Sequence, residues 1–180
     1  MKLNLVILFV LIGSSFCLFA QEESSSVRCD VFSFDKELTL PGTPEEIFDA
    51  VTGDISGWWD HSFSENPLQF YIDPIPGGGF WEIFDEEGNG VLHATVTAAD
   101  RGKLLRFDGP LGLAGKAIQM VTTYTFESVG EDSTLMKISL HAAGEVTDGL
   151  PELVESVWDH FLYERLKPYI ESGNHFNITP

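Results

Sequence analysis

The chain has few basic residues. It contains 10 lysines and arginines against 28 aspartates and glutamates, so its formal net charge at pH 7 is −18. Phosphate backbones and anionic lipid surfaces repel a protein this acidic. We therefore expect no nucleic-acid partner and no stable membrane insertion of the mature chain.

Cysteines and catalytic motifs are also scarce. Only Cys29 lies beyond the N-terminal apolar segment that holds Cys17, so the chain without that segment has no internal disulfide. No serine lies in a nucleophile elbow, and the run 76–79 lacks the lysine of a phosphate-binding loop. We predict no catalytic residue and no cofactor, and we favour a non-enzymatic protein while leaving catalysis open.

The one long apolar run lies at the N-terminus. Lys2 precedes a wholly apolar stretch, and the small Ala20 precedes acidic residues. This layout is typical of a secretory signal peptide over residues 1–20, so we expect a secreted or periplasmic protein. An uncleaved anchor and a lipoprotein attached at Cys17 are weaker alternatives, the second because bulky Phe16 is unfavourable in a lipidation motif.

The rest of the sequence suits a single domain. Residues 21–29 are polar and predict a flexible leader, residues 30–172 carry the folded domain, and residues 173–180 form a C-terminal tail. No internal repeat or linker interrupts the domain. A chain of this length can bury a core without disulfides.

Alternation of apolar and polar residues predicts an antiparallel sheet of about seven strands, separated by glycine-rich turns. The strands are expected at residues 31–40, 67–72, 80–85, 91–98, 103–108, 118–128 and 133–142.

Two short helices are expected after the first strand, and one long helix is expected after the last. Thr43 and Glu46 form a capping box that begins a short helix, and a second helical turn follows through Ile55. A long amphipathic helix begins near Thr147, and Pro168 is expected to end or kink it. The predicted class is α+β, with two short N-terminal helices and one long C-terminal helix across a curved sheet.

Several short motifs follow one another in a distinctive order. They are 41–48, Trp58 with Trp59, Gly78-Gly79-Phe80, 90–96, Leu105 with Phe107, 124–127 and 134–138. Over residues 30–172 this order resembles the START-like, or SRPBCC, helix-grip fold. More narrowly, it is similar to the branch named after the C-terminal domain of activators of heat-shock-protein ATPase. The resemblance implies a cavity between the sheet and the closing helix, in a fold that hosts carriers, cyclases and co-chaperones.

Side-chain parity selects the residues expected to face this cavity. The candidate ligand-binding residues are Trp58, Trp59, Phe80, Glu82, Ala94, Val96, Phe107, Met120, Tyr124, Ile138, Val157, Phe161 and Arg165. Leu92 and Ala98 share the inward parity of Ala94. The alternative interpretation is an ordinary apolar core, although the small alanines favour open space near the centre of the sheet.

Glu82 is the most informative of these candidates. If Phe80 points inward, the Glu82 carboxyl faces an apolar cavity, which would raise its pKa and make it an acid or a ligand anchor. If Trp81 and Ile83 point inward instead, Glu82 is solvated. We favour the first orientation. Arg165 either binds a ligand carboxylate or pairs with a local acid.

The histidines yield no metal prediction. The tripeptide Trp-Asp-His occurs at 59–61 and again at 158–160, and Asp and His from two elements can in principle form a zinc site. We expect none, because His160 lies off the buried helical stripe. His93 and His141 have outward parity and are expected on the surface.

The sequence therefore predicts an exported protein that binds a small hydrophobic or amphipathic molecule between the final helix and the sheet. The first alternative is a cyclase- or hydrolase-type enzyme that uses Glu82, Tyr124 and Arg165 in the same cavity. The second is a co-chaperone-like module with a protein partner, which predicts an exposed apolar patch, formed by Trp81 and Ile83 if they point outward.

Overall fold

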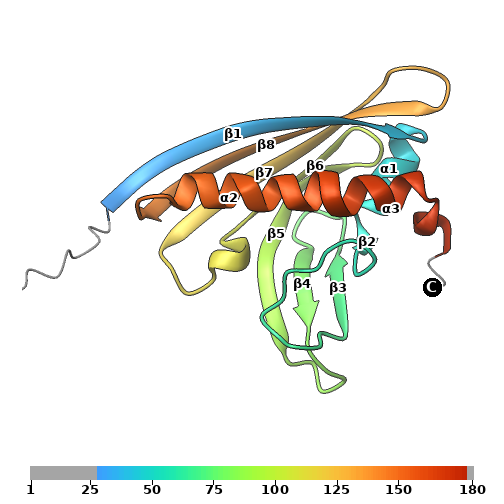
Figure 1. Ribbon diagram of the computed structural model, residues 1–180. Helices are drawn as coiled ribbons and strands as arrows, with labels where there is room; N and C mark the ends of the chain where they lie inside the picture. The colour runs from blue at the N-terminus through green and yellow to red at the C-terminus, as the bar shows by residue number, and fades with distance from the viewer. Residues whose placement is uncertain (1–27, 178–180) are drawn as a thin grey trace, which may run out of the picture.

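The computed structural model describes residues 28–177, so the predicted signal peptide and most of the predicted leader lie outside the described residues. One antiparallel sheet curves around a long C-terminal helical rod that crosses its concave face (Figure 1). The sheet has eight strands in the order β1-β8-β7-β6-β5-β4-β3-β2. The predicted α+β class and the long helix across the sheet are confirmed.

The strands are β1 (Arg28–Pro41), β2 (Gly53–Asp54), β3 (Gln69–Ile72), β4 (Gly79–Ile83), β5 (Gly90–Asp100), β6 (Leu104–Gly109), β7 (Ile118–Ser128) and β8 (Ser133–Val146). Strand β1 pairs along its whole length with β8, so Arg28 and Cys29 belong to the sheet and not to the leader expected at 21–29.

The helical segments are α1 (Pro44–Ala50), the 3₁₀ turn η1 (Leu111–Leu113), α2 (Leu150–Asp159), the π-helical η2 (His160–Leu166), α3 (Lys167–Glu171) and the 3₁₀ turn η3 (Asn174–Asn177). No helix within residues 28–177 is both long enough and apolar enough to cross a membrane.

Helix α1 begins as the sequence predicts. The hydroxyl of Thr43 accepts a hydrogen bond from the Glu46 N–H, and the Glu46 carboxylate accepts one from the Thr43 N–H at 2.8 Å. No helix forms at the position of the predicted second helix, but the predicted turn through Ile55 is present, since the Ile55 carbonyl accepts hydrogen bonds from the Trp58 and Trp59 N–H groups. Gly53 takes a positive φ of 65°, after which Asp54 pairs with Tyr71 of β3, so this stretch joins the sheet and then turns.

Pro168 does not end the C-terminal helix, so the first of the two predicted alternatives is wrong. A π-helical segment precedes it, in which the Lys167 N–H donates to the Leu162 carbonyl, five residues back. Proline has no N–H and its ring crowds the carbonyl of the preceding turn, and the wider π turn accommodates both effects. The rod therefore continues from α2 through η2 and α3 to Glu171.

A bulge in β5 changes the predicted parity. Phe80 of β4 pairs with Ala94, but the next residue, Trp81, pairs with Leu92, so His93 is skipped in the ladder. His93 and Ala94 consequently both point inward, while Leu92 is exposed. The predictions of a surface His93 and an inward Leu92 are therefore wrong. A second register shift beyond Val96 leaves Ala98 only half-buried.

Candidate functional site

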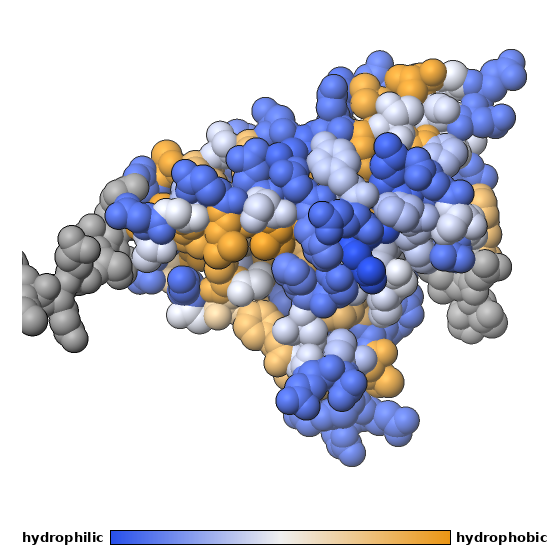
Figure 2. Space-filling view, in the orientation of Figure 1, coloured by the Kyte–Doolittle hydropathy of each residue, from blue (hydrophilic) through white to orange (hydrophobic). Residues whose placement is uncertain are grey.

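An open, mainly apolar pocket of about 480 Å³ lies between α2, the loop after Trp59 and the η1 turn. In Figure 2 apolar side chains gather along the exposed edge of α2 and beneath it. The pocket is lined by Trp59, Asp60, His61, Ser62, Phe63, His93, Leu111, Gly112, Leu113, Met120, Leu150, Leu153, Val154, Val157, Trp158 and Phe161. Its volume lies in the range usual for small-molecule sites, about 300–1,000 Å³.

Four of the predicted ligand-binding residues line this pocket, namely Trp59, Met120, Val157 and Phe161. The others do not. Seven of the others are buried in the core: Trp58, Phe80, Ala94, Val96, Phe107, Tyr124 and Ile138. Glu82 lies behind the loop that forms one wall, and Arg165 is held at the pocket's edge by Asp60, which lines it.

A closed circuit of contacting aromatic side chains occupies much of the space between the helical rod and the centre of the sheet. Trp59 stacks on Phe161 with centroids 3.9 Å apart and meets Phe80 edge-on at 4.9 Å. The circuit then passes from Phe80 through Phe107, Tyr124 and Trp158 back to Phe161, with neighbouring centroids 5.5–6.2 Å apart. Such edge-to-face packing fills the space between the helix and the centre of the sheet. Burial also raises the pKa of Tyr124, which keeps its phenol protonated.

Glu82 points inward, as predicted, while Trp81 is 43% exposed on the opposite face. The predicted direction of its pKa shift is wrong. Burial alone would raise the pKa of Glu82, but hydrogen bonds from Ser62, the Phe63 and Ser64 N–H groups, and His93 outweigh burial and hold this pKa below its ordinary value.

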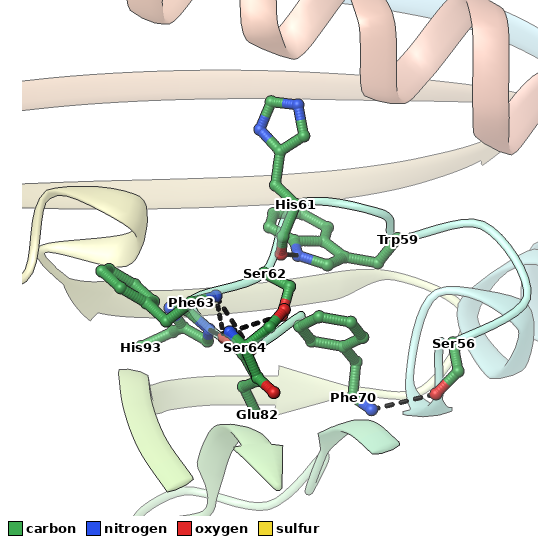
Figure 3. Close-up of polar contacts among 9 residues, drawn as sticks. All are labelled: Ser56, Trp59, His61, Ser62, Phe63, Ser64, Phe70, Glu82 and His93. Atoms are coloured by element: carbon green, nitrogen blue, oxygen red, sulfur yellow. Dashed lines mark hydrogen bonds and ion pairs between the residues drawn. The ribbon is translucent and has the colours of Figure 1, made fainter. Parts of the chain in front are cut away.

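The Glu82 carboxylate organises the loop that follows Trp59 (Figure 3). It accepts hydrogen bonds from the Ser62 hydroxyl, from the Phe63 N–H at 2.9 Å and from the Ser64 N–H at 3.1 Å. Because these donors saturate it, Glu82 is a structural anchor and is not available as a pocket acid. The enzyme alternative thereby loses its predicted acid.

His93 is the polar group that this arrangement turns toward the pocket. Its Nε2 lies 3.0 Å from the Glu82 carboxylate, and its side chain is 3% exposed. The ionised Glu82 carboxylate accepts a hydrogen bond from Nε2, so Nε2 carries a proton. Among the described residues, Nδ1 has no hydrogen-bond partner. A buried polar atom without a partner beside a mainly apolar pocket is a position that the polar group of a ligand can satisfy.

A second polar cluster lies at the pocket's edge, where the two Trp-Asp-His tripeptides meet. His160 Nε2 lies 3.0 Å from both carboxylate oxygens of Asp60, and the rings of His61 and His160 stack with centroids 5.5 Å apart. Arg165 pairs with Asp60 at 3.1 Å, as the local-acid alternative predicted. Hydrogen bonds to Glu164 and Asp60 raise the pKa of His160. Through these contacts the His160 ring packs against the loop and is only partly exposed to solvent.

Sequence reasoning missed most of the pocket wall. The loop residues His61, Ser62 and Phe63 follow no periodic pattern, so no rule of parity could place them. Leu111 also lines the pocket, and its positive φ of 49° is rare for a branched residue. The helix residues Leu150 and Val154 were foreseeable, because both lie on the predicted apolar stripe.

No protein-family model matches this sequence, and no curated protein matches it. Solved structures share its fold. EF2215, a protein of unknown function from Enterococcus faecalis, gives a TM-score of 0.57 at 14% identity, covering 82% of this chain and 77% of that one. CalU16 from Micromonospora echinospora gives 0.53 at 17% identity, covering 81% and 84%. Ara h 8.0201 gives 0.52 at 17% identity, covering 79% and 99%. The chain therefore shares the helix-grip fold of these structures.

Proposed function

We propose that this protein is an exported helix-grip protein that binds a small amphipathic molecule in the pocket beside α2. The observation that carries the proposal is the unpaired Nδ1 of buried His93 at an otherwise mainly apolar pocket. The export part of the proposal rests on the signal-peptide pattern of residues 1–20 alone.

The pocket indicates the chemistry of the ligand. Leucine, valine and aromatic side chains line most of it, so the ligand body is apolar. The Nδ1 atom of His93 has no partner, so the ligand carries one hydrogen-bonding group at its inner end: an O–H or N–H group for a neutral ring, or an acceptor for a protonated ring. A site with a buried polar atom rejects an analogue without the matching group, because the atom then stays unpaired.

The narrower relationship also belongs to this proposal. The motif order, from the capped helix at 44–50 to the hairpin at 118–146, supports the branch named after activators of heat-shock-protein ATPase. Within that branch, the pocket favours a ligand carrier over a protein-interaction module. The exposed pair of Trp81 and Leu92 on the outer face is the feature that supports a protein partner instead.

One observation favours an enzyme as the second candidate. A histidine whose Nε2 is held by a carboxylate presents Nδ1 in the manner of a general base. Such a base would take a proton from a bound hydroxyl or activated carbon of the ligand. In this enzyme hypothesis Glu82 only positions His93. The catalytic candidates named from the sequence, Glu82, Tyr124 and Arg165, do not themselves act on the ligand.

Native mass spectrometry on the chain exported by its own signal tests the proposal. We expect a discrete excess mass that disappears on denaturation. The fluorescent apolar probe 8-anilinonaphthalene-1-sulfonate then reports the pocket. Val154→Trp, which fills the pocket, should abolish probe binding, whereas Val129→Trp, at an exposed site in the hairpin between β7 and β8, should leave it unchanged. An apo mass together with probe binding that survives Val154→Trp would contradict the proposal.

A further inference from the structure

We propose that Asp60, His61 and His160 form a binding site for a divalent transition-metal ion of the zinc type at the edge of the pocket. Each residue offers one ligand atom, and these atoms all lie within 4.8 Å of one another. Imidazole nitrogen and carboxylate oxygen bind Zn²⁺ at about 2.0–2.2 Å, so tetrahedral ligands stand about 3.4 Å apart. Small rotations of exposed side chains bring the three atoms to that spacing.

The surroundings of His160 already suit a metal ligand. Its Nδ1 lies 2.9 Å from the Glu164 carboxylate, one helical turn away. A carboxylate on one ring nitrogen fixes the proton there and turns the other nitrogen to the metal, which is the usual arrangement around metal-bound histidine. The other nitrogen, Nε2, points at Asp60, the second proposed ligand.

The loop that carries the other two ligands is also held in place. The Trp59 indole N–H donates to the His61 carbonyl at 3.0 Å, and the Glu82 carboxylate binds the residues that follow. Figure 3 shows the His61 side chain pointing away from that carboxylate, toward the helix. Two ligands therefore come from a braced loop and one from η2, where the π-helical turn lies.

Arg165 is the group that opposes the metal. Its Nε lies 3.1 Å from Asp60, and its side chain is partly exposed. A bound cation must displace this contact and the His160 proton. Without a metal, the same contacts form only a set of ion pairs that joins the loop to the helix, here called the latch. A metal site and a latch respond differently to the variants described below.

The site is independent of the ligand proposed for the pocket. Three protein ligands leave a fourth tetrahedral position for water or for a donor atom of another molecule. Asp60 and His61 also line the pocket, so this position lies near its opening. Metal binding can therefore succeed or fail whatever the pocket ligand proves to be.

Isothermal titration of the tag-free chain with ZnCl₂, in a Cys29→Ser background, tests the site. We expect one ion per chain, with at least a tenfold loss of affinity in His61→Gln and in His160→Gln. His141→Gln, on the outer face of β8, is the matched control and should bind normally. Circular dichroism checks that each variant is folded.

Arg165→Gln separates the metal site from the latch. If the proposal holds, this variant binds Zn²⁺ several-fold more tightly, because a competing cation has been removed. Glu164→Gln should weaken binding about tenfold through the orientation of His160. The absence of Zn²⁺ binding in the parent chain, binding that survives His160→Gln, or weaker binding in Arg165→Gln would overturn the proposal.

Discussion

The two halves of the space between the helical rod and the sheet are built differently. Toward the middle of the rod, Phe80 packs on Phe107, Phe107 on Tyr124 and Tyr124 on Trp158, so aromatic rings fill the space. Toward its N-terminal end, the facing side chains are shorter, such as Val154 and Met120, and a pocket of about 480 Å³ remains. Both halves use inward-pointing apolar residues, so the size of the facing side chains decides which half is core and which is site.

The largest expected effect comes from breaking the filled half. Phe107→Ala removes a ring that contacts Phe80 and Tyr124 and that is fully buried. We expect a loss of about 3–5 kcal/mol in the free energy of unfolding, because the cavity cannot collapse within a rigid sheet. Leu153→Ala, at a residue 58% exposed beside the pocket, should cost less than about 0.5 kcal/mol. Urea unfolding measures both variants, and equal losses would contradict the distinction.

Glu82→Gln tests whether the Glu82 carboxylate, which lies between the two halves, holds the loop that forms one wall of the pocket. The amide keeps the size of the side chain but cannot accept all the donors that the carboxylate satisfies. We expect a loss of about 2–4 kcal/mol, with faster amide exchange in residues 61–66, measured by hydrogen exchange. Exchange that rises equally throughout the sheet would mean that Glu82 does not act on this loop.

The same variant predicts a dependence on acid. The folded-state pKa of Glu82 is depressed, so its contribution to stability is present above the unfolded-state pKa and disappears as the pH falls through the folded-state value. The stability difference between the parent chain and Glu82→Gln should therefore be full at neutral pH and shrink below about pH 4.3. Melting temperatures measured from pH 7 to pH 3 check the sign.

Replacing His160 is expected to change the stability least. The pH dependence of this change is opposite to that expected for Glu82→Gln. Asp60, Glu164, Arg165 and His61 face this ring, and the two carboxylates raise its pKa. A raised folded-state pKa stabilises the protein fully below the unfolded-state value and ceases to do so as the pH rises through the folded-state value. His160→Gln should therefore cost about 0.2–1 kcal/mol near pH 5.5 and almost nothing at pH 8.5, in metal-free buffer. A cost that grows with pH would contradict this assignment.

The comparison of the two halves also shows how far sequence patterns reach. The capping box at Thr43, the Ser133 hairpin and the apolar helical stripe depend on neighbours a few residues apart, and all three were predictable. Strand parity placed Phe80 and Glu82 on one face of β4, and the favoured orientation, with that face inward, is confirmed. The inward orientation of His93 could not be predicted from parity, because a single skipped residue in β5 reverses the parity on one side of the bulge.

The pocket and the cluster of Asp60, His61 and His160 depend on contacts between distant segments of the chain. Residues 59–63 approach α2 because Glu82, about 20 residues later, satisfies the N–H groups of Phe63 and Ser64. Asp60 and His160 are separated by 100 residues, and only the crossing of the rod over the sheet brings them together. No local pattern reports either approach.

The sequence by itself determined the α+β class, the order of the longer strands and the apolar stripe of the final helix, because hydrophobic periodicity and capping act over one or two turns of chain. The tertiary structure alone decided where the inward face is filled and where it is open. It also decided that the Glu82 carboxylate is saturated while the His93 Nδ1 is not, and that the two distant Trp-Asp-His tripeptides lie in contact. These properties depend on side-chain volume and hydrogen-bond partners supplied by distant parts of the chain, which periodicity does not record.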